Sequence, residues 1–358
     1  MSASDVDGSR MLTQLGLLTF RQRFPWIGGD LQTLRDTLRQ VDLPADEGRP
    51  LKIPVPALPS GAASAGELLA LSDQPEGTAR GVVLLLHGLG GSSSREGLRR
   101  MGLALKQAGF LVLRLNLRGA DPGRHLAGGT YAARCNSDLL PVIARARELA
   151  AGRPLLGAGI SLGGTMLLNA CLTGSGVLDG LFCASSPLDL AACSASIERP
   201  RNRVYQRWLL RRLVRQTLAD PFGVSDLEKT RLSGSSTPRT IRDFDSAVTA
   251  PRWGFADVDA YYREASPLHH LVKAQHRMPK TLLLQAEDDP WVPAAAARDL
   301  ADQIDPSAPI NSIFTRTGGH NGFHGRGGCW GDQLAVAWLT SIVKGCGDER
   351  SGGRKGTD

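Results

Sequence analysis

The sequence predicts an α/β fold in which helices cover both faces of a mostly parallel sheet, because strand-like and helix-like segments alternate along most of the chain. The run FLVLRLN (110–116) is short and continuously apolar, as is typical of a strand buried on both faces. The segment at 94–109 instead places Leu98, Met101 and Leu105 on one face of a helix. In such sheets ligands bind at the carboxyl ends of the strands, so candidate functional residues are sought there.

The expected elements follow one another in a regular order until one long interruption. The expected strands are 67–72, 81–88, 110–116, 154–160, 180–187, 280–286 and 310–314. The expected helices are 94–109, 137–152, 162–172, 293–304 and 330–343. Roughly 90 residues separate the strands at 180–187 and 280–286, far more than a crossover connection needs, and this stretch is expected to form a helical cap over the sheet.

This order divides the 358 residues into four parts. Residues 1–65 are expected to wrap around the core, and residues 188–266 to form the cap or lid insertion. The core itself is assigned to 66–187 and 267–345. The glycine-rich polar end, 346–358, is predicted to be a flexible tail.

Composition indicates a soluble globular protein of the reducing cytoplasm. The chain is 42% hydrophobic and 22% charged, and no apolar run reaches the ~20 residues that a membrane-spanning helix needs. The N-terminus carries early acids and only a short apolar patch, which makes a poor signal peptide. The six cysteines form no CxxC pair, so reduced thiols are favoured over zinc or disulfides, and no cofactor or metal is expected.

The net charge of +7 has a local source in residues 199–215, which hold seven arginines and no acid. The remaining chain has 35 basic and 35 acidic residues, so no nucleic-acid partner is expected. Within 203–218 the arginines recur every fourth residue beside an apolar face, which predicts a basic amphipathic helix in the cap. Its apolar face could cover an active site while the arginines stay in water, or the helix could make peripheral contact with anionic membranes.

A candidate nucleophile lies in the pattern Gly-x-Ser-x-Gly at 159–163, where Ser161 follows a predicted strand and precedes a predicted helix. Many sequences contain this pattern by chance, and a serine in a tight turn is often inert. A strand–serine–helix turn is, however, the arrangement that exposes a reactive serine at the edge of such a sheet. Ser161 is therefore the predicted nucleophile, provided that an acid and a base follow it.

The acid and the base are expected at the ends of later strands, in the order Ser, Asp, His. Asp288 and Asp289 follow the strand at 280–286, and Asp289 is favoured because the Asp-Pro-x-Val-Pro spacing starts a loop that leads into the next helix. Asp288 remains the alternative acid. His320 and His324 lie in a glycine-rich loop after the last strand, and His320 is the predicted base with His324 as the alternative.

The tetrahedral oxyanion of acyl transfer needs two preorganised N–H donors. The backbone amide of Leu162, directly after the serine, is one candidate, and the amide of Leu89 in the segment HGLGG (87–91) is the other. His87 is interpreted as a residue that orients this segment by hydrogen bonding.

These motifs resemble the YheT-like branch of the α/β-hydrolase superfamily over about residues 24–340. The similar motifs are GGDLQT (28–33), HGLGGSS (87–93), LNLRG (115–119), GISLGG (159–164), TIRDFDSAVTAPRWGF (240–255), YYREASP (261–267) and LLLQAEDDPWVP (282–293). The resemblance implies a serine hydrolase of carboxylic esters, with Ser161, Asp289 and His320 as the triad, and some relatives act on medium-chain acyl esters, acylglycerols or phospholipids. The chain departs from the family pattern at Gly90, Ala132 and Thr165, where relatives usually have Glu, His and Asn.

The predicted function is therefore hydrolysis of short- to medium-chain acyl esters or acylglycerols, with a small-molecule ester as partner. An acyltransferase or ester synthase would use the same acyl-enzyme on Ser161, so the sequence leaves that alternative open. A non-catalytic binding relative is disfavoured because all three triad residues are present. The oligomeric state stays open.

Overall fold

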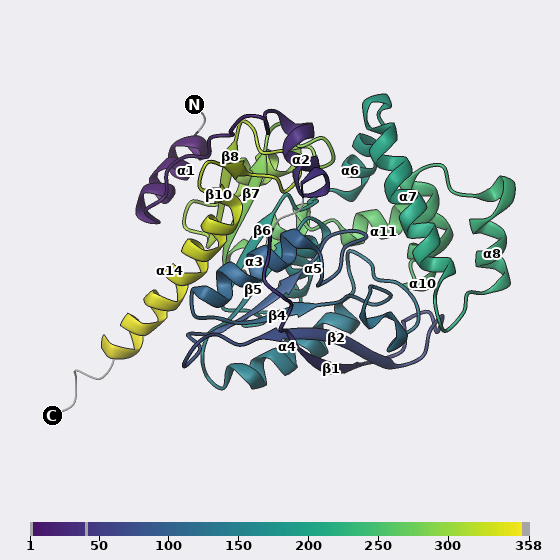
Figure 1. Ribbon diagram of the computed structural model, residues 1–358, viewed down its shortest axis with the longest axis horizontal. Helices are drawn as coiled ribbons and strands as arrows, with labels where there is room; N and C mark the ends of the chain where they lie inside the picture. Colours follow the sequence, from purple (N-terminus) through teal and green to yellow (C-terminus); the bar gives the residue numbers. More distant parts are fainter. Residues whose placement is uncertain (1–2, 40–41, 353–358) are drawn as a thin grey trace.

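The computed structural model describes residues 3–39 and 42–352, and an eight-stranded sheet forms its centre (Figure 1). The strands are β1 Arg49–Val55, β2 Gly66–Asp73, β3 Val82–Leu86, β4 Leu111–Leu115, β5 Leu155–Ile160, β6 Gly180–Ala184, β7 Lys280–Ala286 and β8 Ile310–Thr315. Their order is β1-β2-β4-β3-β5-β6-β7-β8. β2 pairs antiparallel with β1 and β4, and every other pair is parallel, which confirms the predicted sheet.

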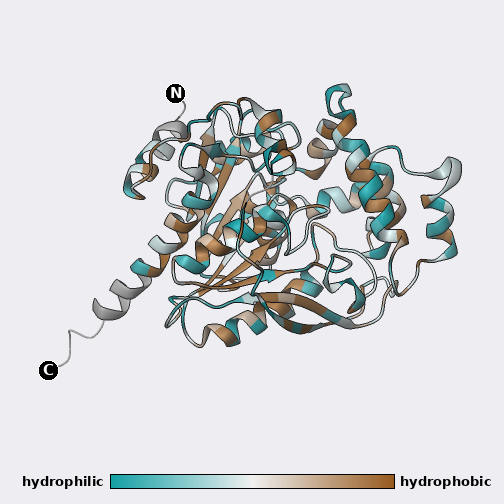
Figure 2. Cartoon of the chain, in the orientation of Figure 1, coloured by the Kyte–Doolittle hydropathy of each residue, from teal (hydrophilic) through white to brown (hydrophobic). Residues whose placement is uncertain are grey.

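The central strands are buried on both faces because their side chains alternate between two apolar layers. In β3, Val82, Leu84 and Leu86 belong to one core cluster, while Val83 and Leu85 belong to the other. All five residues are fully buried. Figure 2 shows the strands as a mainly hydrophobic layer between helices of mixed hydropathy.

Helices cover both faces of this sheet. α4 Asn136–Ala150, α5 Leu162–Cys171 and α13 Ala295–Gln303 contribute to the first core cluster. α3 Glu96–Gln107, the N-terminal helix α1 Ala3–Gln14 and the C-terminal helix α14 Trp330–Gly352 contribute to the second. The N-terminal segment also contains α2 Gly29–Leu38, and a short hairpin of β9 His324–Gly325 and β10 Gly328–Cys329 precedes α14.

Several elements were not expected from the sequence, among them α1, α2 and the β9–β10 hairpin, and two further differences concern β1 and α14. β1 lies in the region expected only to wrap the core, and its burial alternates only over its last three residues. An edge strand with this weak pattern is hard to recognise from sequence. α14 continues to Gly352 instead of ending at residue 343, so it enters the stretch expected to be a tail. Residues 353–358 of that stretch lie outside the described residues.

A group of helices fills the long interval between β6 and β7 and lies at one end of the molecule (Figure 1). The helices of this interval are α6 Leu190–Ile197, α7 Arg203–Leu218, α8 Asp226–Leu232, α9 Ile241–Phe244, α10 Ala250–Arg252, α11 Val258–Ala265 and α12 Leu268–Ala274, with a π-helical turn at Asp245–Thr249. The segment that follows α6 has its own small apolar cluster, which includes Leu209, Leu213, Leu232 and Phe244. We call residues 188–266 the cap. None of the described helices is long and apolar enough to cross a membrane.

Candidate active site

Ser161 occupies the sharp turn between β5 and α5 with a φ of 54° and a ψ of −128°. A positive φ is uncommon for a residue with a side chain and points to a strained, functional position. Glycines make the turn possible: a Cβ on Gly159 would lie 2.4 Å from the backbone N of Gly164, and one on Gly163 would lie 2.6 Å from the carbonyl O of His87. The sequence thus permits a close strand–helix approach that exposes the serine at the strand end.

His320 bridges Ser161 and Asp289. Its Nε2 lies 2.9 Å from the Ser161 Oγ, and its Nδ1 lies 2.9 Å from the Asp289 Oδ2. An ionised Asp289 accepts the Nδ1 proton, which leaves Nε2 free to accept the proton of the serine hydroxyl. The three residues come from the ends of β5, β7 and β8, which parallel pairing places at the same edge of the sheet.

Asp289 is fixed by further donors. Its Oδ1 accepts the backbone N–H groups of Trp291 (2.8 Å) and Val292 (2.9 Å), and its side chain is fully buried. These bonds compensate the burial of the carboxylate and aim Oδ2 at the histidine. The Trp291 ring also packs on the His320 ring at a centroid distance of 4.5 Å.

The loop after β3 borders the serine. A Cβ on Gly88 would lie 2.8 Å from the Ser161 Cβ, so this loop and the turn at Ser161 are in contact. The amide of Gly90 donates to the Tyr131 hydroxyl (2.6 Å), and the amide of Gly91 donates to the Gly88 carbonyl (3.0 Å). The amides of Leu89 and Leu162, by contrast, have no acceptor among the described residues. Both predicted oxyanion donors are thus available to a ligand.

The His87 side chain contacts the backbone of this loop and of the segment after β4. Its Nδ1 lies 2.8 Å from the Gly88 carbonyl O, and its Nε2 accepts the N–H of Leu117 at 3.3 Å. Burial lowers the pKa of His87 to about 4, so the ring is neutral near pH 7. A neutral ring with Nδ1 protonated satisfies both contacts, and His87 therefore orients the loop.

A cavity of about 710 Å³ lies between this edge of the sheet and the cap. Ser161, Leu89 and His320 line it from the sheet side, and the inner faces of α7 and α9 line it through residues such as Leu213 and Phe244. Most of the lining is apolar, which suits an acyl chain. Asp245 and Tyr262 form a polar part of the wall, where the Tyr262 hydroxyl donates to the Asp245 Oδ2 at 2.9 Å.

The two alternative residues have other contacts. Asp288 accepts the amide of Gly319 through Oδ1 at 2.8 Å and does not contact the imidazole of His320. His324 places Nε2 3.2 Å from the Asp36 Oδ1, on the side of α2. Burial lowers the pKa of His324, although the hydrogen bond to Asp36 opposes this shift. Neither residue has a hydrogen bond to Ser161.

Sequence reasoning missed several residues that adjoin the site. Thr33 lies far from the triad in sequence, yet its Oγ1 accepts the amide of His320 at 2.8 Å. Trp291 and Tyr131 were not singled out either. The only available signal for Thr33 was its membership in the GGDLQT motif, which carries no intrinsic chemistry. Among the residues that the structure describes, no group of three His, Cys, Asp or Glu side chains could hold a metal ion.

Comparisons with known proteins identify the family and the fold of the chain. A family model described as "Serine aminopeptidase, S33" (Hydrolase_4) matches residues 77–320. Phospholipase ABHD3 of Mus musculus is 30% identical over 258 residues, which are 69% of this chain and 59% of that protein. YheT of Escherichia coli is 28% identical over 271 residues, which are 73% of this chain and 77% of that protein. The match thus spans less than two thirds of the mouse relative.

Solved structures show the same fold. The crystal structure of 2,6-dihydroxy-pseudo-oxynicotine hydrolase aligns with a TM-score of 0.54 at 15% sequence identity, over 88% of this chain and 72% of that one. Because the family model matches more than half of the chain, the protein belongs to the serine aminopeptidase S33 (Hydrolase_4) family and has the α/β-hydrolase fold.

Proposed function

We propose that the protein is a serine hydrolase that cleaves carboxylic esters through an acyl-enzyme on Ser161. The single observation that carries this proposal is the Ser161–His320–Asp289 chain, with both contacts at 2.9 Å. The unused amides of Leu89 and Leu162 beside the serine supply the oxyanion site. The mainly apolar cavity and the name of the mouse relative, a phospholipase, support an acyl ester as substrate.

In the first half-reaction the Ser161 Oγ attacks the ester carbonyl carbon while the Nε2 of His320 takes the hydroxyl proton. Negative charge develops on the carbonyl oxygen, where the amides of Leu89 and Leu162 stabilise it. The bond to the alcohol oxygen then breaks, and His320 donates its proton to the departing alcohol. Asp289 stays ionised and stabilises the imidazolium throughout.

In the second half-reaction a water molecule attacks the acyl-enzyme and gives its proton to His320. The bond between Oγ and the acyl carbon breaks, the acid leaves, and Ser161 recovers its proton. An alcohol in place of water would yield a new ester by the same steps. Acyl transfer is therefore the alternative function.

Labelling with a fluorophosphonate tests the nucleophile directly, because the Ser161 Oγ would displace fluoride from phosphorus and retain the label. We expect labelling of the wild type and none of Ser161→Ala. An unlabelled wild type would refute the hydrolase proposal, and equal labelling of both proteins would place the nucleophile elsewhere. A chain-length series of p-nitrophenyl esters then measures the preferred acyl length. The same series with added alcohol distinguishes hydrolysis from acyl transfer, because transfer yields a new ester.

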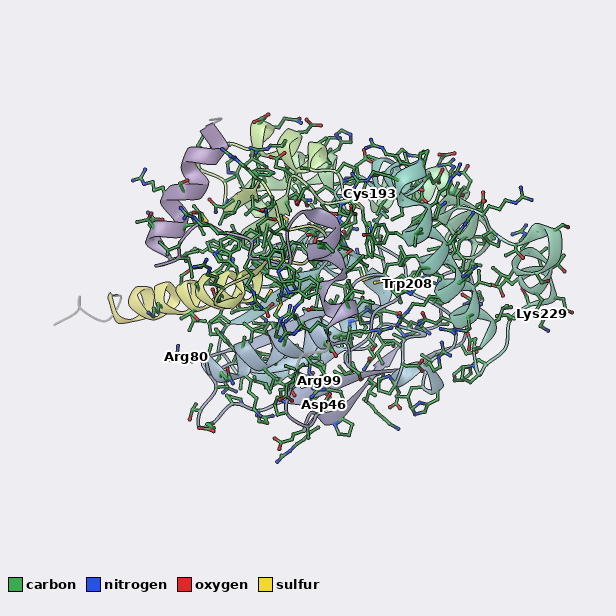
Figure 3. All side chains as sticks on the ribbon, turned by 45° about the horizontal axis from the view of Figure 1, so that its top comes forward. Asp46, Arg80, Arg99, Cys193, Trp208 and Lys229 are labelled. Atoms are coloured by element: carbon green, nitrogen blue, oxygen red, sulfur yellow. The ribbon has the colours of Figure 1, made fainter. Side chains whose placement is uncertain are left out.

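We also propose that the outer face of α7 makes peripheral contact with anionic membranes. Arg203, Arg207, Arg211 and Arg215 are exposed on this face and have no ion-pair partner among the described acids. Val204 is exposed beside them, at 77%. Trp208 on the same helix instead lines the cavity, and Figure 3 labels it where the cap faces the rest of the molecule. A helix with this composition suits the headgroup region of an anionic bilayer.

Flotation with liposomes tests this contact. We expect the protein to float with vesicles that contain an anionic phospholipid and to stay below with purely zwitterionic vesicles. The double variant Arg207→Gln/Arg211→Gln should float less. Equal flotation with both lipid mixtures would refute the electrostatic contact.

A further inference from the structure

We propose that the N-terminal segment 28–33 holds the catalytic histidine loop in position, with Thr33 as a positioning residue and Asp288 as its second support. This inference rests on the proposed function, because it assigns roles around His320. It gives a function to the GGDLQT segment, which no step of the ester chemistry uses. The N-terminal part of α2 meets the loop 318–324 although almost 300 residues separate them in sequence.

The contact with Thr33 fixes the backbone from which the imidazole extends. The amide of His320 donates to the Thr33 Oγ1 at 2.8 Å, and the same hydroxyl donates to the Gly29 carbonyl at 2.7 Å. Thr33 thus uses its hydroxyl once as acceptor and once as donor. The first bond tethers His320, and the second holds the threonine side chain in the orientation that accepts it.

Asp288 supports the residue before the histidine. Its Oδ1 accepts the amide of Gly319 at 2.8 Å. Its backbone carbonyl in turn lies against Gly29, where a Cβ would approach it to 2.1 Å. The loop after β7, the start of α2 and the histidine loop therefore meet at one point.

The close approach of the histidine loop to the start of α2 leaves no room for a side chain at Gly319. Gly319 has a φ of 57°, and a Cβ there would lie 2.2 Å from the Gly29 carbonyl O and 2.7 Å from the Thr33 Oγ1. Glycine at 319 satisfies the left-handed backbone and leaves room for Thr33. The two segments are complementary in shape as well as in hydrogen bonding.

The far end of the same loop is held by Gln32, which is almost completely buried. Its Oε1 accepts the amide of His324 at 2.7 Å, and its Nε2 donates to the His324 carbonyl at 3.1 Å. Between these anchors, Asn321 and Phe323 have positive φ values of 59° and 50°. Strained residues persist only where their surroundings fix them, so we expect the conformation of this loop to depend on its hydrogen bonds with segment 28–33.

The catalytic consequence follows from the geometry of His320. The imidazole must stay within hydrogen-bonding distance of both Ser161 and Asp289, and a displacement of about 1 Å can cost on the order of 100-fold in rate. The Thr33 hydroxyl bonds to backbone groups of His320 and Gly29 and not to the side chains of Ser161, Asp289 or His320. It acts through the backbone of His320, and its loss should lower kcat more than it raises KM.

The test compares Thr33→Val, which keeps the shape but removes the hydroxyl, with Thr33→Ser, which keeps the hydroxyl. The control is Thr13→Val, because Thr13 on α1 also donates to the carbonyl four residues earlier, is exposed, and touches no part of the site. Rates of fluorophosphonate labelling and of p-nitrophenyl ester hydrolysis are measured well below the melting temperature and per folded molecule. The pH dependence of kcat/KM is recorded for each protein.

We expect Thr33→Val to lose about 10- to 100-fold in kcat and labelling rate. Its acid limb of kcat/KM should shift to lower pH, because a displaced imidazolium loses stabilisation by Asp289. Thr33→Ser should recover most of the rate, and Thr13→Val should match the wild type. A purely structural role would lower the melting temperature without moving the acid limb. That result, or wild-type rates in Thr33→Val, would overturn the inference while leaving the hydrolase proposal intact.

A second pair of variants examines Asp288. Asp288→Ala removes the acceptor of the Gly319 amide and should slow labelling about tenfold, whereas Asp288→Asn keeps an oxygen there and should stay within about threefold of the wild type. Equal rates in both variants would remove Asp288 from the proposal. A wild type that takes up no label would overturn the hydrolase assignment and this inference with it.

Discussion

The core around the sheet and the outer face of α7 differ in how they accommodate charge. On the sheet side, the Arg118 and Asp138 side chains are almost completely buried and paired at 2.7 Å. Arg114 is likewise paired with Asp46 and Asp73 at 2.6 Å each, and Figure 3 labels Asp46 beside Arg99, its other partner. The arginines on the outer face of α7 have no such partners among the described residues. Burial makes pairing obligatory, whereas an exposed charge remains available to a partner outside the chain.

The sheet and the cap also differ in how their apolar side chains are packed. The sheet belongs to two large clusters that include every central strand, whereas α7, α8 and α9 of the cap pack around a small cluster of their own. The rest of the cap, including α11, joins one of the large clusters. A region with a small core opens at a lower free energy than the body to which it is attached. We therefore expect the part of the cap around α7 to α9 to open more readily than the sheet that positions Ser161, Asp289 and His320.

The largest expected effect is the loss of one partner of a buried ion pair. Asp138→Ala leaves Arg118 buried without its carboxylate and should lower the free energy of unfolding by about 3–5 kcal/mol. Asp259→Ala breaks the exposed pair with Arg242 and should cost at most about 1 kcal/mol. Urea denaturation of both variants measures the difference. Equal costs would contradict the contrast between buried and exposed pairs.

Matched leucine truncations compare the two cores. Leu84→Ala in β3 should lower the global free energy of unfolding by about 3–5 kcal/mol, since it leaves a cavity in a central strand. Leu232→Ala in α8 should destabilise the cap by about 2–3 kcal/mol. Amide hydrogen exchange separates them, because Leu232→Ala should accelerate exchange in the cap and leave β3 to β6 protected. Faster exchange throughout the sheet would show that the cap and core unfold as one unit.

A pH effect of intermediate size is expected from the cap side of the cavity. Burial raises the pKa of Asp245 to about 6, so the folded protein binds this proton more tightly than the unfolded chain. The contribution of Asp245 to stability is therefore complete below its ordinary pKa of 3.8 and is lost as the pH rises towards 6.

Asp245→Asn removes this dependence. Relative to the wild type, the variant should gain on the order of 1–3 kcal/mol in the free energy of unfolding between pH 4 and pH 7. The exposed Asp226 offers the control, and Asp226→Asn should change little between the two pH values. Parallel curves for the wild type and Asp245→Asn would argue against a protonated carboxyl at this position.

The smallest effect is expected on the outer face of α7. Arg207→Gln/Arg211→Gln should change the free energy of unfolding by less than about 0.5 kcal/mol, because these exposed arginines have no partners to lose. Thermal unfolding measures this. A larger loss of stability would mean that the arginines interact within the chain and would weaken the case for membrane contact.

The sequence by itself predicted the positions of most strands along the chain, the turn at Ser161 and the candidates for the acid and the base. These features depend on local patterns: continuous apolar runs for buried strands, glycines around a serine, and acids or histidines directly after a strand. The chain order Ser, Asp, His indicated where to look for the acid and the base, and the Asp-Pro-x-Val-Pro spacing favoured Asp289 over Asp288. β1 was not predicted because its buried and exposed residues alternate only weakly, as in many edge strands.

Only the tertiary structure shows which of two neighbouring candidates contacts His320, and which distant residue contacts the backbone of the histidine loop. Asp288 and Asp289 are adjacent in sequence, and the path of the loop after β7 aims one at the His320 ring and the other at the Gly319 amide. Thr33 could not be connected with His320 from the sequence, because a hydrogen bond across 287 positions leaves no local pattern. Local periodicity reports which way a side chain faces, whereas the position of a distant backbone depends on how the whole sheet and its helices pack.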